Sequence, residues 1–519
     1  MSDAAASALA APDEPAFRAI ADLVAERARD APHAQAIVDA ATTLDYAALD
    51  ALIDRTAAAL QRDGIVPGEA VAVCAANGAR YAAVLLGALR AGAALAPLSH
   101  SSTPAAFDAM LRDSGARLLF VDAQGAALLG EPAASPALVA LGDDAPGLRF
   151  EDWLAPAGST PRRVAIAPQM AFNIIYSSGT TGTPKGIVQS HAMRWSHVMR
   201  GATLGYGPGA VTLIATPLYS NTTLVAFLPT LAWGGCVVLM EKFDVLRYLE
   251  LAQRHRATHA MLVPVQYQRL LAHPRFGEFD LRSFRMKFCT SAPFAAALKA
   301  DILARWPGGL VEYYGMTEGG GSCALLAHEH PDKLHTVGQP LPGHDIRLID
   351  EQGRELPAGA TGEIVGRSGA MMTGYHRQPA KTAEAEWFDA EGRRYIRTGD
   401  IGRFDAEGFL TLLDRRKDMI ISGGFNIYPS DLEAVLRAHP AVAEAAVAGV
   451  PSVAWGETPV AWVVLRDGVA AIDAESLRQW ANAKLGRTQR IAALHLLNAL
   501  PRSAIGKVLK TELRARHRP

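Results

Sequence analysis

The sequence predicts an α/β fold with a large N-terminal domain, made of parallel α/β subdomains plus a β-rich subdomain, and a small α+β C-terminal domain. The chain has 519 residues, which is enough for several domains with buried cores. Half of the residues are hydrophobic and a fifth are charged, a composition typical of folded globular proteins. Strand-like and helix-like segments alternate in the first third, and the last part, about a hundred residues, has a compact pattern of its own.

The first third of the chain carries the alternation that predicts a parallel sheet. The expected strands are 71–75 (VAVCA), 93–99 (AALAPLS) and 117–123 (RLLFVDA), and the expected helices are 79–92 and 103–115. Strands that alternate with helices form parallel sheets covered by those helices. Residues 129–169 are rich in Pro, Ala and Gly, so we expect loops or a sheet edge there.

Residues 201–240 contain no charged side chain, and their second half is as long as a membrane span. Pro229, Gly234 and Gly235 interrupt this stretch, and proline and glycine disfavour a continuous helix. We therefore expect a buried helix followed by a short strand, CVVLM, and no membrane span.

The remaining segments complete the predicted domains. An apolar strand, FNIIYSS, precedes a second α/β stretch that runs to about residue 317, and short strands separated by Gly turns occupy residues 337–413. After DRRKDMI, two helices (PSDLEAVLRAH and AESLRQWANAKL) and two strands (VAEAAVAGV and PVAWVVLRD) form a compact unit. We expect one domain over residues 1–416 and a second over residues 417–519.

The charge balance and the cysteines restrict the classes of function. Fifty-one basic and 52 acidic residues give a net charge of -1, so no overall field attracts nucleic acid or an anionic membrane. The four cysteines are too few and too far apart for a disulfide framework, and the N-terminus lacks the pattern of a secretory signal. We expect a cytoplasmic protein without nucleic-acid partners; the oligomeric state stays open, a homodimer included.

The motif YSSGTTGTPKG at residues 176–186 is the most informative segment. It follows an apolar strand and offers backbone N–H groups, hydroxyls and the cation Lys185, which together suit a polyphosphate. It is not a Walker A loop, because Lys185 follows Pro184 and precedes Gly186. A surface turn is the alternative, but eleven residues in this order favour phosphate binding.

This loop resembles the phosphate-binding signature of the adenylate-forming superfamily, which contains acyl-CoA synthetases, amino-acid adenylation domains and luciferases. Further motifs of that family follow in order: YYGMTEGG at 313–320, GEI from 362, the segment 395–429 and PRSAIGKVLK at 501–510. The motif set is most like that of a carboxylate–CoA ligase. The resemblance implies ATP, Mg²⁺ and coenzyme A as ligands, and a mobile C-terminal domain.

The resemblance assigns the nucleotide and the metal to named residues. Thr317 contacts the phosphates, Glu318 holds Mg²⁺, and Tyr314 stacks on adenine beside Ala292 and Pro293. The ribose hydroxyls are assigned to Asp400 as acceptor and Arg415 as donor. The phosphate loop contributes Ser177, Ser178, Gly179, Thr180, Thr181, Gly182 and Lys185. Such contacts neutralise charge while a carboxylate attacks the α-phosphorus and pyrophosphate leaves.

A second group of residues is assigned to the catalytic lysine and to coenzyme A. Lys507 matches the family lysine that bridges the substrate carboxylate and the α-phosphate, and Lys417 matches the hinge of the mobile domain. Gly423 and Gly424 leave room for a pantetheine arm. Trp455 aligns with an aromatic residue that packs on the CoA adenine in some ligases, and a core or interface tryptophan is the alternative.

The acid is expected to bind near Tyr219, Ser220 and Asn221 and near Gly319, Gly320 and Gly321. Many relatives have His in place of Ser220, and adenylation domains have a carboxylate nearby that binds an amino group. No such carboxylate is present, which disfavours an amino-acid substrate.

The expected pocket walls are the segments 217–230, 261–267, 288–294 and 311–325, which offer no cation. A second carboxylate on the substrate would therefore lack a partner once desolvated. We expect a monocarboxylic acid with an uncharged tail, fatty or aryl, and poor turnover of dicarboxylic acids. His191 and Arg194, just after the phosphate loop, are the residues that could change this expectation.

Three functions are compatible with the sequence. A carboxylate–CoA ligase has the full motif set, and an acyl-AMP ligase that loads a carrier protein differs only in the acceptor. A binding or scaffold protein that has lost catalysis predicts damage at the Lys, Glu or Asp motif positions, and all of these are intact. The motifs do not exclude a luciferase-type oxygenase, although the C-terminal residues are no peroxisomal address.

Overall fold

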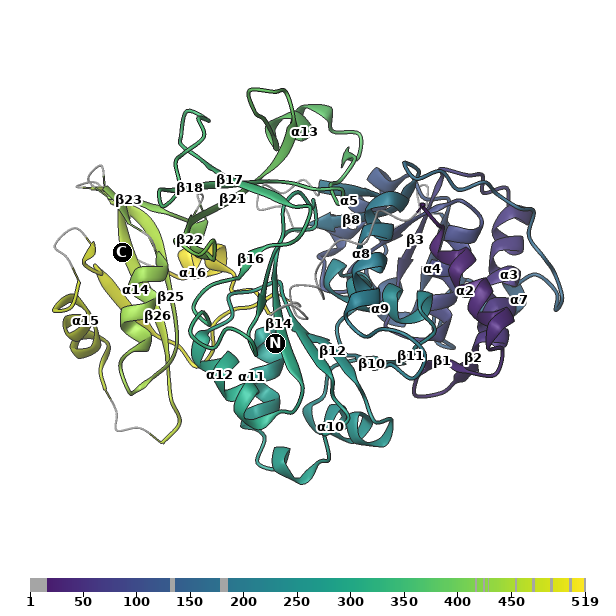
Figure 1. The fold of residues 1–519 in the computed structure, drawn as a ribbon, viewed down its shortest axis with the longest axis horizontal. Coiled ribbons are helices and arrows are strands. Elements are labelled where there is room, and N and C mark those ends of the chain that lie inside the picture. Colours follow the sequence, from purple (N-terminus) through teal and green to yellow (C-terminus); the bar gives the residue numbers. More distant parts are fainter. Residues whose placement is uncertain are drawn as a thin grey trace. The chain divides into compact units, whose positions relative to one another are not determined.

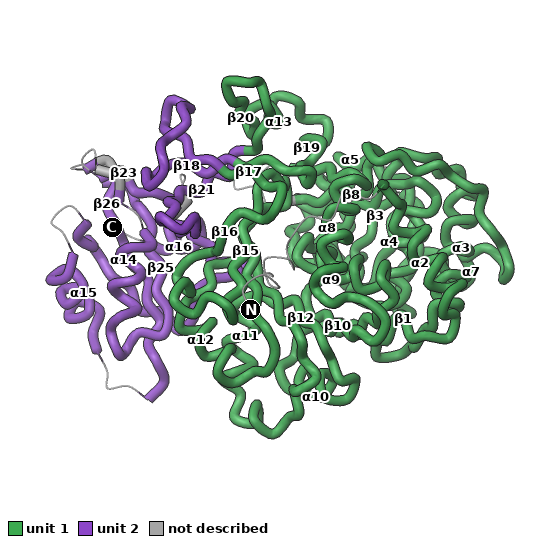
Figure 2. Tube along the Cα trace, viewed as in Figure 1, with its two compact units in different colours: residues 1–346, 366–396 green, residues 347–365, 397–519 purple. Residues whose placement is uncertain are grey.

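The computed structural model describes residues 16–130, 136–177, 185–415, 418–422, 425–427, 429–452, 455–468, 472–485, 489–503 and 506–517, with the backbone alone described at Ser177, Asp414, Arg415, Ile421, Phe425, Asn426 and Gly456. It confirms the α/β class, with a large N-terminal part and a smaller C-terminal part. The chain divides into two compact units (Figure 2), residues 1–346 with 366–396 and residues 347–365 with 397–519. The expected domain boundary at residue 417 stays a prediction.

The first unit contains an eight-stranded sheet in the order β19-β9-β8-β4-β3-β5-β6-β7 (Figure 1). Its strands are β3 (Ala70–Cys74), β4 (Ala94–Pro97), β5 (Leu118–Val121), β6 (Ala137–Ala140), β7 (Leu148–Arg149), β8 (Ala171–Ser177), β9 (Lys185–Ser190) and β19 (Gly374–Tyr375). The pairs formed by β3 with β4 and with β5 are parallel, as the sequence predicts. The Pro-rich stretch supplies strand β6 and the edge strand β7.

Alternating side chains of β3 explain why helices cover both faces of this sheet. Val71 and Val73 belong to the large core formed with helices α3 and α4, whereas Ala72 and Cys74 belong to a separate core that includes residues of α5. The helices that accompany this sheet are α2 (Ile20–Asp30), α3 (Tyr46–Arg62), α4 (Ala79–Arg90), α5 (Pro104–Ser114), α6 (Ala123–Ala126), α7 (Phe150–Trp153) and α8 (His191–Thr203). A strand buried on both faces is typical of parallel sheets.

A nine-stranded sheet completes the core of the first unit, in the order β16-β15-β14-β13-β12-β10-β11-β1-β2. The strands are β1 (Gln35–Val38), β2 (Thr43–Asp45), β10 (Val211–Ile214), β11 (Cys236–Leu239), β12 (His259–Leu262), β13 (Met286–Cys289), β14 (Gly309–Tyr314), β15 (Cys323–Leu326) and β16 (Gln339–Pro340). Helices α9 (Asn221–Ala232), α10 (Val245–Arg254), α11 (Pro264–Ala272), η1 (Phe276–Glu278) and α12 (Ala296–Arg305) lie between its strands in the sequence.

The uncharged stretch forms a buried helix and a strand, as predicted, but Pro229 does not end the helix. Helix α9 continues through Pro229 to Ala232 and stops before Gly234, which has a φ of +88°. The proline ring is accommodated by Gly201 of α8, where a Cβ would lie 2.5 Å from the Pro229 Cβ. No helix in the described part of the chain is long and apolar enough to cross a membrane.

The β-rich segment and the C-terminal part form two further sheets. One has the order β17-β18-β21-β20 with β22 beside β21, and the other has the order β24-β23-β26-β25 with β27 beside β26. The division between the units falls within β17, β18 and β21. The strands are β17 (Asp345–Ile349), β18 (Thr361–Arg367), β20 (Glu386–Phe388), β21 (Arg394–Phe404), β22 (Leu410–Arg415), β23 (Ile420–Ser422), β24 (Phe425–Ile427), β25 (Val442–Ser452), β26 (Gly456–Leu465) and β27 (Ala493–Leu496).

The C-terminal helices match the sequence pattern. They are α14 (Pro429–Arg437), α15 (Ala474–Asn482) and α16 (Lys510–Arg516), and α13 (Pro379–Glu384) lies in the first unit. Leu432 and Leu436 of α14 and Leu477 of α15 pack against β25 and β26 in a core of their own. The second unit therefore has an independent hydrophobic core.

Candidate active site

The predicted site residues of the first unit follow strands that run parallel to one another. Strands β10, β12, β13 and β14 are paired in parallel register, with Thr212, His259, Met286 and Gly309 side by side. The chain leaves β10 toward Tyr219, β13 toward Ala292 and β14 toward Thr317. The carboxyl ends of parallel strands share one edge of a sheet, where ligands commonly bind.

Tyr375 connects the residue expected to bind Mg²⁺ with the lysine of the phosphate loop. Its hydroxyl donates to Glu318 Oε1 over 2.9 Å, and the Lys185 Nζ lies 5.0 Å from the centre of its ring. Tyr375 reaches this position because β19 pairs with β9, with Tyr375 opposite Ile187. Burial and the neighbouring Glu318 carboxylate raise the pKa of the Tyr375 hydroxyl far above its usual value, so the phenol stays protonated and donates.

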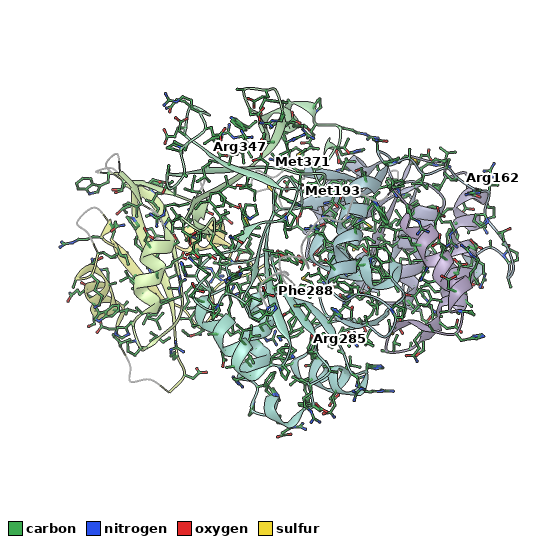
Figure 3. All side chains as sticks on the ribbon, in the orientation of Figure 1. Arg162, Met193, Arg285, Phe288, Arg347 and Met371 are labelled. Atoms are coloured by element: carbon green, nitrogen blue, oxygen red, sulfur yellow. The ribbon has the colours of Figure 1, made fainter. Side chains whose placement is uncertain are left out.

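The glycines after Glu318 are required by close backbone packing. Gly319 has a φ of +76°, and a Cβ there would lie 1.9 Å from the Ala370 carbonyl oxygen. Gly320 N–H donates to the same oxygen over 3.1 Å, and Met372 N–H donates to the Glu318 carbonyl over 2.7 Å. Figure 3 labels Met371, which forms an isolated β-bridge with Gly319, and Met193, whose Cε lies 2.9 Å from the Gly319 Cβ position. The segment 370–372 thus fixes the direction of the Glu318 backbone.

A buried polar cluster lies beneath this turn. Gln189 Nε2 donates to the Thr317 carbonyl over 2.6 Å, and Gln189 Oε1 accepts from Arg194. Arg194 also donates to Asn221 Oδ1 over 2.8 Å. Asn221 begins helix α9 after the buried Ser220. The cluster therefore joins two of the predicted acid-binding segments, and it includes Gln189, which the sequence analysis did not identify.

Arg194 is held in this cluster by neutral oxygens. Its guanidinium is fully buried, and burial lowers its pKa to about 9. Its third acceptor is Asn173 Oδ1 at 3.1 Å, and no carboxylate within the described residues forms an ion pair with it. The neighbouring His191 is buried against Phe172, with no hydrogen-bond partner for either ring nitrogen among the described residues. Burial lowers the pKa of His191 to about 4, so its ring is neutral at pH 7.

The residues assigned to adenine also follow paired strands. Tyr314 is buried at the end of β14, and the turn that contains Ala292 follows β13. Ser291 opens this turn with a φ of +80°, which is strained for a non-glycine residue, and its hydroxyl shares a hydrogen bond with the Thr222 hydroxyl. Ala292 is half-buried and Pro293 is exposed.

Asp400 and Arg415 are opposite each other in the second unit. Their Cα positions are partners in the antiparallel pair of β21 and β22, which supports the prediction that both contact the same sugar. The Thr398 hydroxyl accepts from the Asp400 N–H over 3.0 Å and donates to the Ile364 carbonyl over 2.9 Å. The Thr398 hydroxyl therefore connects the Asp400 backbone to strand β18.

Lys507 lies in a tight turn of the second unit. Ser503 N–H donates to the Lys507 carbonyl over 2.8 Å, and Lys507 N–H donates to the Ser503 hydroxyl over 3.1 Å. Gly506 has a φ of +78°, so it suits a turn that residues with a Cβ adopt less readily. Trp455 is 61% exposed in the same unit, so the core alternative for this tryptophan does not hold.

The predicted site residues fall into two groups, one in each unit. The first unit carries Lys185, Tyr219, Ser220, Asn221, Ala292, Pro293, Tyr314, Thr317, Glu318, Gly319, Gly320 and Gly321, and the second carries Asp400, Arg415, Trp455 and Lys507. Ser178, Gly179, Thr180, Thr181, Gly182, Lys417, Gly423 and Gly424 lie outside the described residues.

The chemistry of Glu318 fits a magnesium ion that is shared with a nucleotide. Mg²⁺ is commonly bound through one or two carboxylates together with substrate phosphates. In the part of the chain that the structure describes, no group of three or more His, Cys, Asp or Glu residues could hold a metal by itself. Glu318 would therefore hold the ion together with phosphate oxygens.

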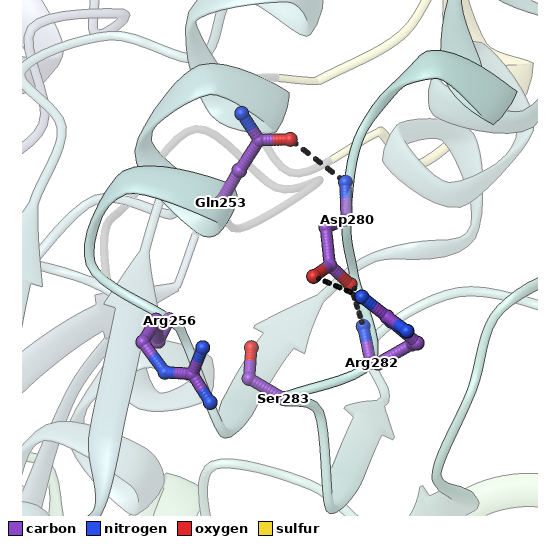
Figure 4. Close-up of a pocket in the computed structure, with 5 residues that line it drawn as sticks. All are labelled: Gln253, Arg256, Asp280, Arg282 and Ser283. Atoms are coloured by element: carbon purple, nitrogen blue, oxygen red, sulfur yellow. Dashed lines mark hydrogen bonds and ion pairs between the residues drawn. The ribbon is translucent and has the colours of Figure 1, made fainter.

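A surface hollow of about 260 Å³ in the first unit has a different set of lining residues (Figure 4). It is lined by Gln253, Arg256, Asp280, Arg282 and Ser283. The Asp280 carboxylate accepts from Arg282, and the Asp280 N–H donates to Gln253 over 2.8 Å. Asp280 and Arg282 are thus paired with each other, and no predicted site residue lines this hollow.

Comparison with known proteins identifies the family. Residues 24–376 match the AMP-binding enzyme family, and residues 431–507 match the AMP-binding enzyme C-terminal domain. A feruloyl-CoA synthase of an Amycolatopsis species is 35% identical over 499 residues, covering 94% of this chain and 97% of that relative. The fatty acid–[acyl-carrier-protein] ligase ScoC of Streptomyces coeruleorubidus is 32% identical, covering 97% of each chain.

Solved structures of adenylate-forming enzymes share the fold. The ATP-bound structure of MatB from Rhodopseudomonas palustris matches with a TM-score of 0.84 at 31% identity, covering 95% of this chain and 98% of that one. Sequence and fold agree over nearly the whole length, and the predicted superfamily is confirmed. The chain therefore belongs to the adenylate-forming superfamily of AMP-binding enzymes, among relatives that are acid–thiol ligases.

Proposed function

We propose that the protein is an ATP-dependent carboxylate–CoA ligase. It activates a monocarboxylic acid with an uncharged tail, fatty or aryl, and then transfers the acyl group to coenzyme A. The observation that best supports this proposal is the contact of Tyr375 with both Glu318 and Lys185. This contact brings a proposed metal ligand and a proposed phosphate-binding cation close together. That combination suits a nucleotide polyphosphate with its magnesium ion.

The proposed reaction has two balanced steps. In the first, a carboxylate oxygen of the acid attacks the α-phosphorus of ATP, the bond to the β-phosphate breaks, and pyrophosphate leaves. In the second, the thiol of coenzyme A loses its proton to solvent, its sulfur attacks the acyl carbon of the acyl-AMP, and AMP leaves with the electrons of the broken C–O bond. Lys185 and Lys507 would offset the negative charge of the first step, and Glu318 would hold Mg²⁺.

The acyl acceptor in this proposal, coenzyme A, has one alternative, a carrier protein. ScoC, by its name, loads a carrier protein, whereas the feruloyl-CoA synthase makes a CoA thioester. An acyl-AMP ligase that loads a carrier protein is therefore the alternative function. The exposed Trp455 favours coenzyme A, because an aromatic face in solvent can stack on the CoA adenine.

A pyrophosphate-release screen tests the proposal. Fatty, benzoic and cinnamic acids are incubated with ATP, Mg²⁺ and either coenzyme A or a holo carrier protein, and thioesters are identified by mass. We expect ATP- and acid-dependent pyrophosphate release and a CoA thioester. Acylation of the carrier protein alone would establish the alternative, and an absence of acid-dependent pyrophosphate release would contradict both.

A further inference from the structure

Arg194 is a fully buried arginine whose guanidinium nitrogens donate to three different side-chain amides. Nε donates to Asn173 Oδ1 over 3.1 Å, Nη1 donates to Asn221 Oδ1 over 2.8 Å, and Nη2 donates to Gln189 Oε1. The Arg194 Cζ also lies 5.7 Å from the centre of the Phe172 ring. The planar group is therefore held in one orientation by contacts within its plane and over one face.

The chemistry of arginine decides which end of each amide faces it. A guanidinium has N–H donors and no acceptor, so all three amides turn their oxygen toward Arg194. The NH2 group of Gln189 then points away, and its Nε2 donates to the Thr317 carbonyl over 2.6 Å. Asn173 shows the same constraint, because its buried Nδ2 has no hydrogen-bond partner among the described residues. The guanidinium thus determines the direction of the Gln189 donor.

Gln189 connects two parts of the predicted phosphate site. It is fully buried on β9, the strand that begins at Lys185, and it pairs with Asn173 of β8. The carbonyl that it holds belongs to Thr317, the predicted phosphate contact, which directly precedes the predicted metal ligand Glu318. A hydrogen bond in a buried, low-dielectric setting is stronger than one exposed to water. The Thr317 backbone is therefore connected firmly to the strand that carries Lys185.

The same guanidinium also contacts the predicted acid-binding segment. Asn221 is the first residue of α9 and follows Ser220. Its Oδ1 accepts from Arg194 Nη1 and lies 3.5 Å from Gln189 Nε2. Arg194 therefore links the start of α9 with the amide that holds the Thr317 backbone.

Stability alone does not account for a cation at position 194. The acceptors of Arg194 among the described residues are neutral amide oxygens, and a buried charge without an opposite charge is costly. Apolar side chains of similar size at these positions would avoid both the buried charge and the unpaired Nδ2 of Asn173. Local arrangements that cost stability are typical of functional sites.

We propose that Arg194 is a positioning residue for the activation of the acid by ATP. Through Gln189 it holds the Thr317 backbone where the threonine contacts the nucleotide phosphates, and it holds Asn221 directly. This inference rests on the proposed carboxylate–CoA ligase function, which supplies the role of Thr317. Arg194 touches no substrate itself, so its loss changes the binding of the phosphates and not the recognition of the nucleoside.

Equilibrium binding of ATP with Mg²⁺ and of adenosine tests the inference, because the two ligands share the nucleoside and differ in the phosphates. The adenosine Kd divided by the ATP Kd is the phosphate contribution to affinity. Arg194→Met removes the guanidinium donors, and Gln189→Leu removes the amide that they orient. Gln189→Glu keeps an acceptor for Arg194, which holds the new carboxylate ionised, but has no donor for the Thr317 carbonyl.

Lys287→Met is the matched control. Lys287 is also a fully buried cation of the first unit. It donates to the backbone carbonyls of Trp306, Pro307 and Gly308. None of these is a predicted site residue, so this variant reports the loss of a buried cation without the loss of the contact with Thr317.

We expect Arg194→Met, Gln189→Leu and Gln189→Glu each to lower the phosphate contribution about tenfold, with adenosine binding within about threefold of the wild type. Arg194→Met combined with Gln189→Leu should lose no more than about threefold beyond either substitution alone, because both remove the same connection. Lys287→Met should keep the phosphate contribution within about threefold of the wild type. If Arg194→Met does not fold, Gln189→Glu, which keeps the Arg194 contact, decides the test.

An unchanged phosphate contribution in Gln189→Glu, an equal fall in Lys287→Met, or additive losses in the double variant would overturn the inference. A fall in Arg194→Met without one in Gln189→Glu would also overturn it, since the effect would not pass through Gln189. Acid-dependent pyrophosphate release is measured with the same proteins. Its absence in the wild type counts only against the proposed function, because the binding comparison requires neither acid nor coenzyme A.

Discussion

Tyr375 is the residue at which two predicted roles meet, since it contacts Glu318 through its hydroxyl and Lys185 through its ring. A hydrogen bond to a metal ligand orients that ligand, and its loss typically costs about 10- to 100-fold in metal affinity or activity. We expect Tyr375→Phe to raise the Mg²⁺ concentration needed for half-maximal pyrophosphate release by about tenfold or more. Activity measured over a Mg²⁺ titration at saturating ATP checks this.

The phenylalanine keeps the ring beneath Lys185, so it isolates the hydroxyl. Tyr395→Phe is a suitable control, because Tyr395 is also a buried tyrosine whose hydroxyl donates to a carboxylate, that of Asp345 over 2.5 Å. A Mg²⁺ requirement unchanged in Tyr375→Phe would show that the Glu318 contact has no role in metal binding.

Lys507 provides a second test at the scale of one residue. The resemblance to the family implies that Lys507 acts in only one of two poses of a mobile C-terminal domain. We expect Lys507→Ala to lower acid-dependent pyrophosphate release by about a hundredfold or more, while thioester formation from pre-made acyl-AMP stays within a few-fold. Single-turnover assays of each half-reaction make the comparison, and equal losses in both would argue against this division.

Substitution of Asp400 tests the proposed contact with the ribose of the nucleotide. Its position opposite Arg415 supports an acceptor role toward the ribose hydroxyls. Hydrogen bonds to a charged group contribute about 1.5 to 3 kcal/mol each, so Asp400→Ala should weaken ATP binding at least about tenfold. Equilibrium binding of ATP is the measurement, with 2′-deoxy-ATP as a control. If Asp400→Ala and the wild type bind ATP equally, the ribose assignment is wrong.

Sequence alone could predict those site residues that belong to long ordered motifs. Lys185 and Glu318 are of this kind, because several neighbours specify each position. Tyr375 is not, since it reaches Glu318 only through the pairing of the two-residue strand β19 with β9.

At the scale of elements, the turn between β14 and β15 depends on close backbone contact. A Cβ at Gly319 would overlap the Ala370 carbonyl, and its φ of +76° disfavours any other residue. We expect Gly319→Ala to lower the free energy of unfolding by about 2 to 4 kcal/mol and to impair activity by moving Glu318. Denaturant unfolding checks the stability change.

Gly343→Ala is a matched control, since Gly343 also has a positive φ, of +75°, with no atom within 4 Å of its Cβ position. It should show the cost of the backbone conformation without that of the overlap. An equal loss in the two variants would mean that contact with Ala370 does not specify the glycine.

Helices and strands were predictable from the sequence in some segments and not in others. The strands and helices of residues 70–121 were predictable because apolar runs alternate with amphipathic helices. The continuation of α9 through Pro229 was not, because it depends on Gly201 in the neighbouring helix leaving space for the proline ring. Local propensity disfavours a proline there, and tertiary packing decides otherwise.

At the scale of the whole molecule, buried neutral histidines make stability depend on pH. Burial lowers the pKa of His191 to about 4 and that of His344 to about 3, and it also lowers those of His197 and His259. The unfolded chain binds these protons near pH 6.5, so it gains protons before the folded protein does as the pH falls. The stabilisation is therefore complete above about pH 6.5 and is lost progressively toward pH 4.

We expect the first unit to unfold at lower denaturant concentration at pH 5 than at pH 7.5, with each such histidine contributing on the order of 1 to 3 kcal/mol. His191→Phe, which places a ring beside Phe172, should reduce this pH dependence. Denaturant midpoints measured from pH 5 to 8 for both proteins provide the test. An unfolding midpoint that rises as the pH falls through this window would contradict the assignment.

The fold class was predictable for the whole chain and the family from the motifs between residues 176 and 510, whereas the candidate site was predictable only in parts. Motif order specifies Glu318 in the first unit and Asp400 and Lys507 in the second. The predicted acid-binding walls leave out helix α8, although its Arg194 contacts Asn221 of one predicted wall, because no pattern in the sequence reveals that this arginine is buried.

Trp455 gives the protein an optical reporter of its own. All eight tryptophans lie in the described residues, and Trp455 is the exposed one among them. An aqueous collisional quencher will therefore reach its indole ring before the others, and the quenchable fraction of the emission will come chiefly from this residue. A ligand that covers the ring will shield that fraction, so the proposed binding of coenzyme A at Trp455 can be tested by a fluorescence titration without a label or a chemical step.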